Sequence, residues 1–347
     1  MVRRTFVTTC ARFFQRAKTR CGRILTIAVA VVASSQSASI AFATWLGEIE
    51  EPAVVEQPVA ESYQTTDCEC APQLADACCC PDDGHSFSVF LGLEGSKQPQ
   101  DFGVNAHFGG RSAVNWGLPI SRRYGLGLQL GTAVNATANA VQVVERVEGS
   151  TGRTQSFTTV GVFQHTSGGL VWGGGYDFLY QDYYDEFFLG QWRGTVGYDL
   201  TMRDQVGVQA SLRDRDDDGF FGATAVELRP ITMGSVYYRH IFASGARLGG
   251  WGGLADRHSE ANAALGDLPA KDNPFLFGSD VYVPLNNHLA LFGEANFIMP
   301  SDTGTVDAYL GVEIYPWGGA RRGRNGRFAP VLPVANSTSF AVDLLRQ

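Results

Sequence analysis

Charge and helical periodicity are scarce in this chain of 347 residues, and cysteine is absent after position 80. Charged residues make up 18% of the chain. No window has a convincing apolar period of 3.6 residues, which argues against a helical protein. Glycine occurs 41 times, well above its usual share of about 7%. Hydrophobic residues still reach 44%, so the chain can bury a core and does not have the composition of a disordered protein.

Basic residues are rare outside the first 43 positions. The chain has 27 Lys and Arg against 35 Asp and Glu. Residues 1–43 hold seven basic and no acidic residues, so removing them leaves 27 − 7 = 20 basic against 35 acidic residues, a formal charge of −15. Binding nucleic acid requires a basic surface that contacts phosphates. The composition therefore argues against a nucleic-acid partner.

The first 43 residues have the three-part pattern of a secretory signal peptide. Basic residues continue to Arg23, an apolar run covers residues 24–33, and Ala41 and Ala43 place small side chains where signal peptidase requires them. The apolar run is too short for a membrane-spanning helix, which needs about 20 residues. We expect export and cleavage after Ala43.

The cysteines lie in the expected signal peptide and in one later cluster. The five that would remain after cleavage are Cys68, Cys70, Cys78, Cys79 and Cys80. In an oxidising compartment we expect them to form disulfides within this segment or crosslinks to a neighbouring envelope protein. Because five is an odd number, at least one thiol must stay free, bind a metal or pair with another chain. Their spacing departs from that of structural zinc sites.

The sequence from residue 86 to 318 alternates apolar and polar residues between turn signals. The clearest segments are residues 86–94, 124–135, 187–200, 204–213 and 305–315. A period of two indicates β-strands, and with less regular segments there are about 12. Connections of hairpin length make them antiparallel, and a sheet of this size avoids open edges by closing. We predict an all-β fold, an antiparallel up-and-down barrel.

The two faces of these strands indicate the surroundings of the barrel. A membrane barrel has strands of about 9–11 residues, an apolar outer face, a polar lumen and aromatic residues at both interfaces. Aromatic residues cluster at strand ends in 176–188 and 315–317. The side chains expected to face the lumen are Arg193, Asp199, Arg213, Glu294, Asp307 and Glu313. A secreted β-sandwich that binds surface polysaccharide would show similar alternation and is the alternative.

The segments on either side of the predicted barrel have a different composition. Residues 44–85 contain repeated Glu, several Pro and the cysteine cluster without an apolar period, which predicts a disordered linker. Residues 319–347 begin with an Arg- and Gly-rich run. We expect this tail either to be disordered or to bind acidic lumen residues or lipid phosphates through its arginines.

Several runs of the sequence carry a family resemblance. They are GLEGSKQPQDFGVNAHFGG (92–110), QSFTTVGVF (155–163), YDFLYQDYYDEFFLGQWRG (176–194), ALGDLPAKDN (264–273), NFIMPSDTGTVDAYLGVEIYPWGG (296–319) and STSFAVDL (337–344). In these runs the chain resembles an uncharacterised family of exported planctomycete proteins of predicted outer-membrane β-barrel type. The resemblance implies the fold and an envelope location, and it implies no activity.

Patterns typical of metal binding or catalysis are few. Asp214, Asp216 and Asp218 place carboxylates on alternate residues, as in the first half of a calcium-binding loop. The closing position falls on Ala225 instead of Glu, so we expect weak Ca²⁺ binding at most and no other cofactor. The histidines are scattered, and no nucleophile, base and acid form a recognisable set. We expect no enzymatic activity.

These patterns together lead to one functional expectation. The chain should be an outer-membrane β-barrel in contact with lipid, acting as a passive pore or an envelope scaffold. If the lumen is open, its excess of carboxylates predicts mild cation selectivity.

Overall fold

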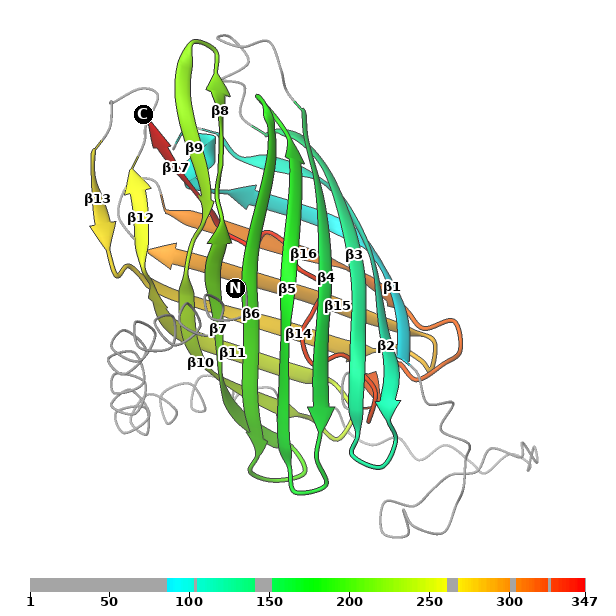
Figure 1. The fold of residues 1–347 in the computed structure, drawn as a ribbon. Coiled ribbons are helices and arrows are strands. Elements are labelled where there is room, and N and C mark those ends of the chain that lie inside the picture. The colour runs from blue at the N-terminus through cyan, green and yellow to red at the C-terminus, as the bar shows by residue number, and fades with distance from the viewer. Residues whose placement is uncertain are drawn as a thin grey trace, which may run out of the picture. The chain divides into compact units, whose positions relative to one another are not determined.

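The computed structural model describes residues 86–102, 105–140, 152–260, 268–299, 304–323 and 326–346. In this part, twelve strands close into one antiparallel barrel, with β16 pairing back onto β1 (Figure 1). The barrel confirms the predicted fold class. It also shows that the β-sandwich alternative is wrong, because a sandwich has two separate sheets. The predicted signal peptide, linker and cysteine cluster lie outside the described residues.

The strands follow one another around the barrel in simple hairpin order. The barrel strands are β1 (Ser86–Lys97), β2 (His107–Ser121), β3 (Leu126–Asn139), β4 (Gly152–His165), β5 (Leu170–Asp182), β6 (Glu186–Asp199), β7 (Asp204–Arg215), β10 (Met233–Ile241), β11 (Arg247–Ala255), β14 (Phe275–Pro284), β15 (Leu289–Met299) and β16 (Thr305–Ile314). The remaining described elements are η1 (Pro99–Asp101), β8 (Asp217–Phe221), β9 (Thr224–Pro230), β12 (Arg257–Glu260), β13 (Leu268–Asp272) and β17 (Val342–Arg346).

Alternation in the sequence explains the two faces of the wall. In β6, Gln191 and Arg193 are buried, whereas Trp192 and Val196 are exposed. Successive side chains of a strand point to opposite faces. One face of each strand therefore lines the lumen, where most of the buried polar residues lie, and the other forms a largely apolar outer surface.

The two ends of the barrel have different connections. At one end, which we call the turn mouth, short turns join neighbouring strands. These turns are residues 122–125, 166–169, 200–203, 242–246 and 285–288. At the other end, which we call the loop mouth, the connections are longer. There η1 follows β1, the β8–β9 hairpin follows β7, and β12 and β13 follow β11 (Figure 1). The first barrel strand begins and the last one ends at the turn mouth, because Val89 pairs with Ile314.

Residues 326–346, which we call the threading segment, pass through the lumen from the turn mouth to the loop mouth. Near the turn mouth, the carbonyl oxygen of Ala329 lies 3.0 Å from Nε2 of His165. Farther along, a guanidinium nitrogen of Arg193 donates to the carbonyl of Pro333 at 2.7 Å. At the loop mouth the segment ends as β17, which pairs with β9. Figure 1 shows this part of the chain in red inside the barrel.

Apolar packing joins the threading segment to the wall. Phe340, Val342 and Leu344 of the segment belong to one buried cluster with Phe157 and Phe187 of the wall. The rings of Phe157 and Phe340 lie 6.0 Å apart in an edge-to-face arrangement, a favoured aromatic geometry. Within the described ranges, no helix is long and apolar enough to cross a membrane.

Candidate functional site: the occupied lumen

The lumen is lined by buried polar side chains, and the outer face is apolar. Buried residues of the inner face include Glu94, Arg111, Gln129, Asn135, Gln155, Asp177, Gln191, Arg193, Asn296 and Asp307. Large exposed residues of the outer face include Leu91, Leu93, Leu130, Val160, Phe178, Trp192, Val196, Leu212, Phe277 and Leu310. A soluble barrel would have the opposite arrangement, because burial of apolar surface drives folding in water.

Wall side chains bind the backbone of the threading segment. Gln129 donates to the carbonyl of Leu332 at 2.7 Å, and Gln191 donates to that of Ser339 at 2.9 Å. A guanidinium nitrogen of Arg111 donates to the carbonyl of Ala335 at 3.3 Å. A buried carbonyl without a partner costs free energy. The wall amides and guanidinium groups therefore replace the ladder hydrogen bonds that this part of the segment lacks.

Two prolines explain why wall side chains, instead of a neighbouring strand, bind the backbone of the threading segment. Pro330 and Pro333 lack an N–H group and have a fixed φ, so this stretch cannot continue a regular sheet. In this stretch the N–H group of Ala335 donates to Oγ1 of Thr159 at 2.9 Å. The result is an extended chain held by the wall's polar side chains.

A buried ion pair lies at the centre of this contact. Nε of Arg193 lies 2.9 Å from Oδ2 of Asp177, and both side chains are almost fully buried. Asp177 also accepts hydrogen bonds from Thr159 at 2.8 Å and Gln191 at 3.1 Å. Buried charges are tolerated when such bonds satisfy their remaining sites. Arg193 in turn binds Pro333, so the pair positions the group that holds the segment.

Glycines on the lumen face leave space for the segment. A Cβ atom at Gly117 would lie 2.1 Å from the carbonyl oxygen of Phe328. A Cβ atom at Gly131 would lie 2.6 Å from Cγ2 of Val334. Glycine in a strand often marks a close approach of another part of the chain. The wall is therefore shaped for the segment at these two positions.

The later part of the segment is fixed inside the barrel and at the loop mouth. Thr338 donates a hydrogen bond to Glu294, and Ser337 donates one to Glu94. Asp343 in β17 accepts a hydrogen bond from Arg229 of β9 at 2.7 Å. These contacts and the β17–β9 pairing hold the segment at the end opposite to its entry.

The six residues predicted to face the lumen fall into three groups in the structure. Arg193 and Glu294 contact the threading segment, as described above. Asp307 accepts a hydrogen bond from Gln98 at 3.0 Å, and Glu313 accepts one from Ser88 at 2.7 Å, both inside the barrel. The other two predicted residues, Asp199 and Arg213, are exposed at the turn mouth and at the loop mouth, respectively.

The predicted calcium ligands have different neighbours. Asp214 accepts a hydrogen bond from the Tyr176 hydroxyl at 2.7 Å, Asp216 lies 3.7 Å from Arg213, and Asp218 lies on β8. Burial raises the pKa of Asp216, an effect that Arg213 opposes. The described residues contain no group of three or more His, Cys, Asp or Glu arranged to hold a metal. Calcium binding stays a prediction.

Sequence reasoning left open whether the tail enters the lumen, and it did not single out Asp177 of β5, the partner of Arg193. Asp177 could have been assigned to the lumen from the alternation, because Tyr176 and Phe178 flank it on the opposite face. Arg321, Arg322 and Arg327 of the tail are exposed, so their binding to lipid phosphates stays a prediction. The polar contacts inside the barrel come from later residues and from backbone carbonyls.

Comparisons with known proteins give a family and several solved barrels. The sequence profile of a family of unknown function, DUF6666, matches residues 86–342. No curated protein sequence matches the chain. The match agrees with the resemblance to a family without an assigned activity, and the planctomycete origin of that family stays an expectation.

Among solved structures, the chain is similar to an outer-membrane channel from Pseudomonas putida F1, with 8% identity, 67% of this chain and 95% of that chain covered, and a TM-score of 0.47. It is also similar to the β domain of the Bordetella autotransporter BrkA, with 11% identity, 68% and 100% covered, and a TM-score of 0.41. A third similar structure is the outer-membrane phospholipase A of Escherichia coli, with 10% identity, 65% of this chain and 89% of that chain covered, and a TM-score of 0.37. At these values the likeness carries no functional information.

Proposed function

We propose that this chain, which belongs to the DUF6666 family of unknown function, is an outer-membrane β-barrel whose resting function is that of a closed envelope scaffold. The observation that carries the proposal is the threading segment, which occupies the lumen from one mouth to the other. Of the two roles expected from the sequence, passive pore and scaffold, an occupied lumen favours the scaffold. The proposed role involves no catalysis.

The outer surface supports a lipid environment. Barrel strands run from 9 residues in β10 to 15 in β2, which meets the length needed to cross a bilayer. Their outward side chains are apolar, and Trp192 and Leu93 expose more than half of their surface. A continuous apolar face of this kind would be costly in water, whereas in a bilayer it contacts acyl chains.

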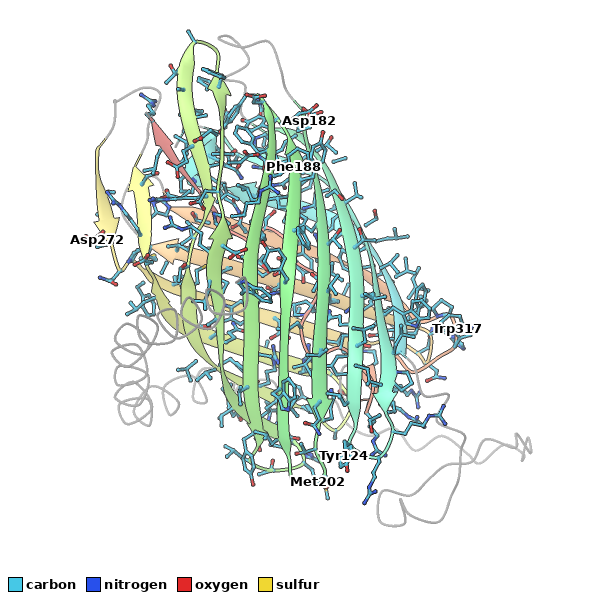
Figure 2. The ribbon with its side chains drawn as sticks, in the orientation of Figure 1. Tyr124, Asp182, Phe188, Met202, Asp272 and Trp317 are labelled. Atoms are coloured by element: carbon cyan, nitrogen blue, oxygen red, sulfur yellow. The ribbon has the colours of Figure 1, made fainter. Side chains whose placement is uncertain are left out.

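Aromatic residues at both ends of the strands support the same proposal. Tyr124 and Trp317 are 62% and 63% exposed at the turn mouth, and Phe188 is exposed near the loop mouth. Figure 2 shows Tyr124 and Trp317 near one end of the barrel and Phe188 toward the other. Aromatic girdles at the two membrane interfaces are typical of outer-membrane barrels.

Fractionation and gel mobility test the location and the fold together. We expect the chain to stay in the membrane fraction after a salt wash and to be released by detergent. We also expect the unheated protein to migrate differently from the heated one, because a closed barrel resists unfolding by detergent. Release by the salt wash would contradict the membrane location.

Conductance distinguishes a scaffold from a pore. In planar bilayers we expect the full chain to be silent or nearly silent, because polar wall residues are bound to the threading segment instead of water. Steady conductance by the full chain would instead support the passive pore. The predicted crosslinks through the cysteine cluster are a separate prediction, to be checked on non-reducing gels.

A further inference from the structure

The threading segment fills the lumen unevenly. Its carbonyl groups bind side chains of β2, β3 and β6, at Arg111, Gln129 and Arg193. Next to β6, the consecutive barrel strands β7, β10, β11 and β14 (Figure 1) border two cavities. The inner cavity has a volume of about 70 Å³ and the mouth cavity about 170 Å³. Both exceed the roughly 10–15 Å³ that one water molecule needs.

The inner cavity has an apolar side and a polar side. Trp251, Met233 and Leu276 supply the apolar side. The polar side includes Ser235 and Gln209, and its charged groups at Arg193 and Glu294 already have partners in Asp177 and Thr338. Toward the loop mouth, a layer of packed apolar side chains covers the cavity. This layer consists of Ile231, Ala255, Leu276, Ile298 and Ala341, with Met233 and Trp251 against it. The cavity therefore has a closed end.

The mouth cavity connects this region with the turn mouth. Its lining includes Asp199 and Arg203, which are exposed in and beside the turn at 200–203. Arg239 lines both cavities and is thus the boundary between them. A solute that enters from the turn mouth meets this side chain before it reaches the inner cavity.

Two guanidinium groups share one carboxylate at this boundary. Arg247 binds Oδ2 of Asp280 at 2.9 Å. Arg239 is held more loosely, with Nε 3.6 Å from Oδ1 of Asp280 and Nη1 3.5 Å from the Gln205 side-chain oxygen. Its guanidinium group also lies 4.5 Å from the centre of the Tyr237 ring. Arg239 has capacity for a shorter ionic contact, because its contacts with Asp280 and Gln205 are long.

We propose that the two cavities form a blind binding site for a small organic carboxylate with an apolar body, entered from the turn mouth. The carboxylate binds Arg239, because a planar guanidinium group pairs with a carboxylate through two parallel hydrogen bonds. The apolar body lies against Trp251, Met233 and Leu276 in the inner cavity. This site adds a ligand to the scaffold role and does not require conduction.

Calorimetry on the full chain in detergent tests the site, with sodium benzoate as the probe. We expect saturable binding, a loss of affinity of at least about tenfold in Arg239→Gln, and unchanged affinity in Arg122→Gln. Arg122 is an exposed arginine at the same mouth that lines neither cavity. Inorganic phosphate and glucose should bind at least about tenfold more weakly than benzoate. Gel mobility of the unheated variants confirms that each barrel is closed.

A second variant separates the two parts of the site. Trp251→Leu should weaken benzoate binding by about fivefold or more and leave acetate binding unchanged, because acetate has almost no apolar body. The proposal is overturned if benzoate gives no saturable heat, if Arg239→Gln and Arg122→Gln bind it equally, or if glucose binds as well as benzoate.

Thiol labelling tests the entry route. In a full chain with its seven cysteines replaced by serine, Ser235→Cys places a thiol in the inner cavity, and Ser244→Cys places one in the exposed turn at 242–246. We expect an anionic thiosulfonate to label position 235 faster than a cationic one, and benzoate to slow that labelling at least about threefold without affecting position 244. Labelling at 235 that ignores both reagent charge and benzoate would overturn the route.

Discussion

Arg193 connects the wall to the threading segment through a buried network. It pairs with Asp177 at 2.9 Å and donates to the carbonyl of Pro333 at 2.7 Å. Asp177 depends on this pairing, because its carboxylate is fully buried between β4 and β6. A residue of this kind stabilises two parts of the structure at once, so its removal should affect both.

We predict that Arg193→Ala lowers the free energy of unfolding by about 3–5 kcal/mol, because it leaves Asp177 as an unpaired buried charge. Urea unfolding in detergent measures the change. The double variant Arg193→Met with Asp177→Leu should be less destabilised than Arg193→Ala, since it removes both charges. Equal losses in the two proteins would show that the ion pair is not the source of the effect.

The glycines on the lumen face give a second prediction at the residue scale. Gly117→Ala should lower stability by about 1–3 kcal/mol through overpacking and should speed amide hydrogen exchange in residues 328–335, because the new Cβ meets the carbonyl of Phe328. Gly110→Ala is the matched control, since a Cβ there has nothing within 4 Å. The same response in both variants would contradict the close approach of the segment.

At the scale of elements, the barrel strands could be predicted and the threading segment could not. In β6 and β16 the alternation of polar and apolar residues determines which face is buried, and this local pattern appears directly in the sequence. The segment has no such pattern where it passes the wall. Its extended path depends on side chains more than 100 residues away in sequence, such as Gln129 for Leu332.

The candidate site was also predictable only in part: the sequence indicates which side chains point inward, but not what they contact. The inward positions of Arg193, Glu294, Asp307 and Glu313 follow from alternation. Their partners do not, because hydrogen bonds such as that from Thr338 to Glu294 form only once the segment is inside the barrel. The cavity at Arg239 has the same origin, since part of its lining belongs to the segment.

The strand at the end of the segment should act as its anchor. We predict that Asp343→Ala increases amide hydrogen exchange in β17, because Arg229 loses its ion pair and the Ser259 N–H loses its acceptor at 2.8 Å. A buried donor left without a partner costs about 1–3 kcal/mol. Asp182→Ala, at an exposed position at the same mouth (Figure 2), is the control and should leave β17 unchanged. Unchanged exchange in Asp343→Ala would mean that strand pairing alone holds the end.

For the whole molecule, threading places the two ends of the described chain at opposite mouths. Ser86 begins β1 at the turn mouth, and Arg346 ends β17 at the loop mouth. In outer-membrane barrels the short turns face the periplasm and the longer connections face the exterior. The C-terminal end of the threading segment should therefore be displayed at the cell surface.

Epitope tags test this orientation. A tag after residue 347 should bind antibody on intact cells, whereas a tag in the turn at 242–246 should bind only after the outer membrane is made permeable. The second tag is the internal control for cell integrity. If the turn tag is reached in intact cells and the C-terminal tag is not, the orientation is the reverse of the one predicted.

The central claim is that the chain forms a membrane barrel closed by its own C-terminal segment. The most direct test compares, in planar bilayers, the conductance of the full chain with that of a variant that ends at Gly318. The full chain should be silent or nearly so. The truncated chain, with its closed barrel verified by gel mobility, should conduct with mild cation selectivity, because carboxylates outnumber basic groups among the buried lumen residues. Equal conductance of the two proteins, or silence of the truncated barrel, would contradict the claim.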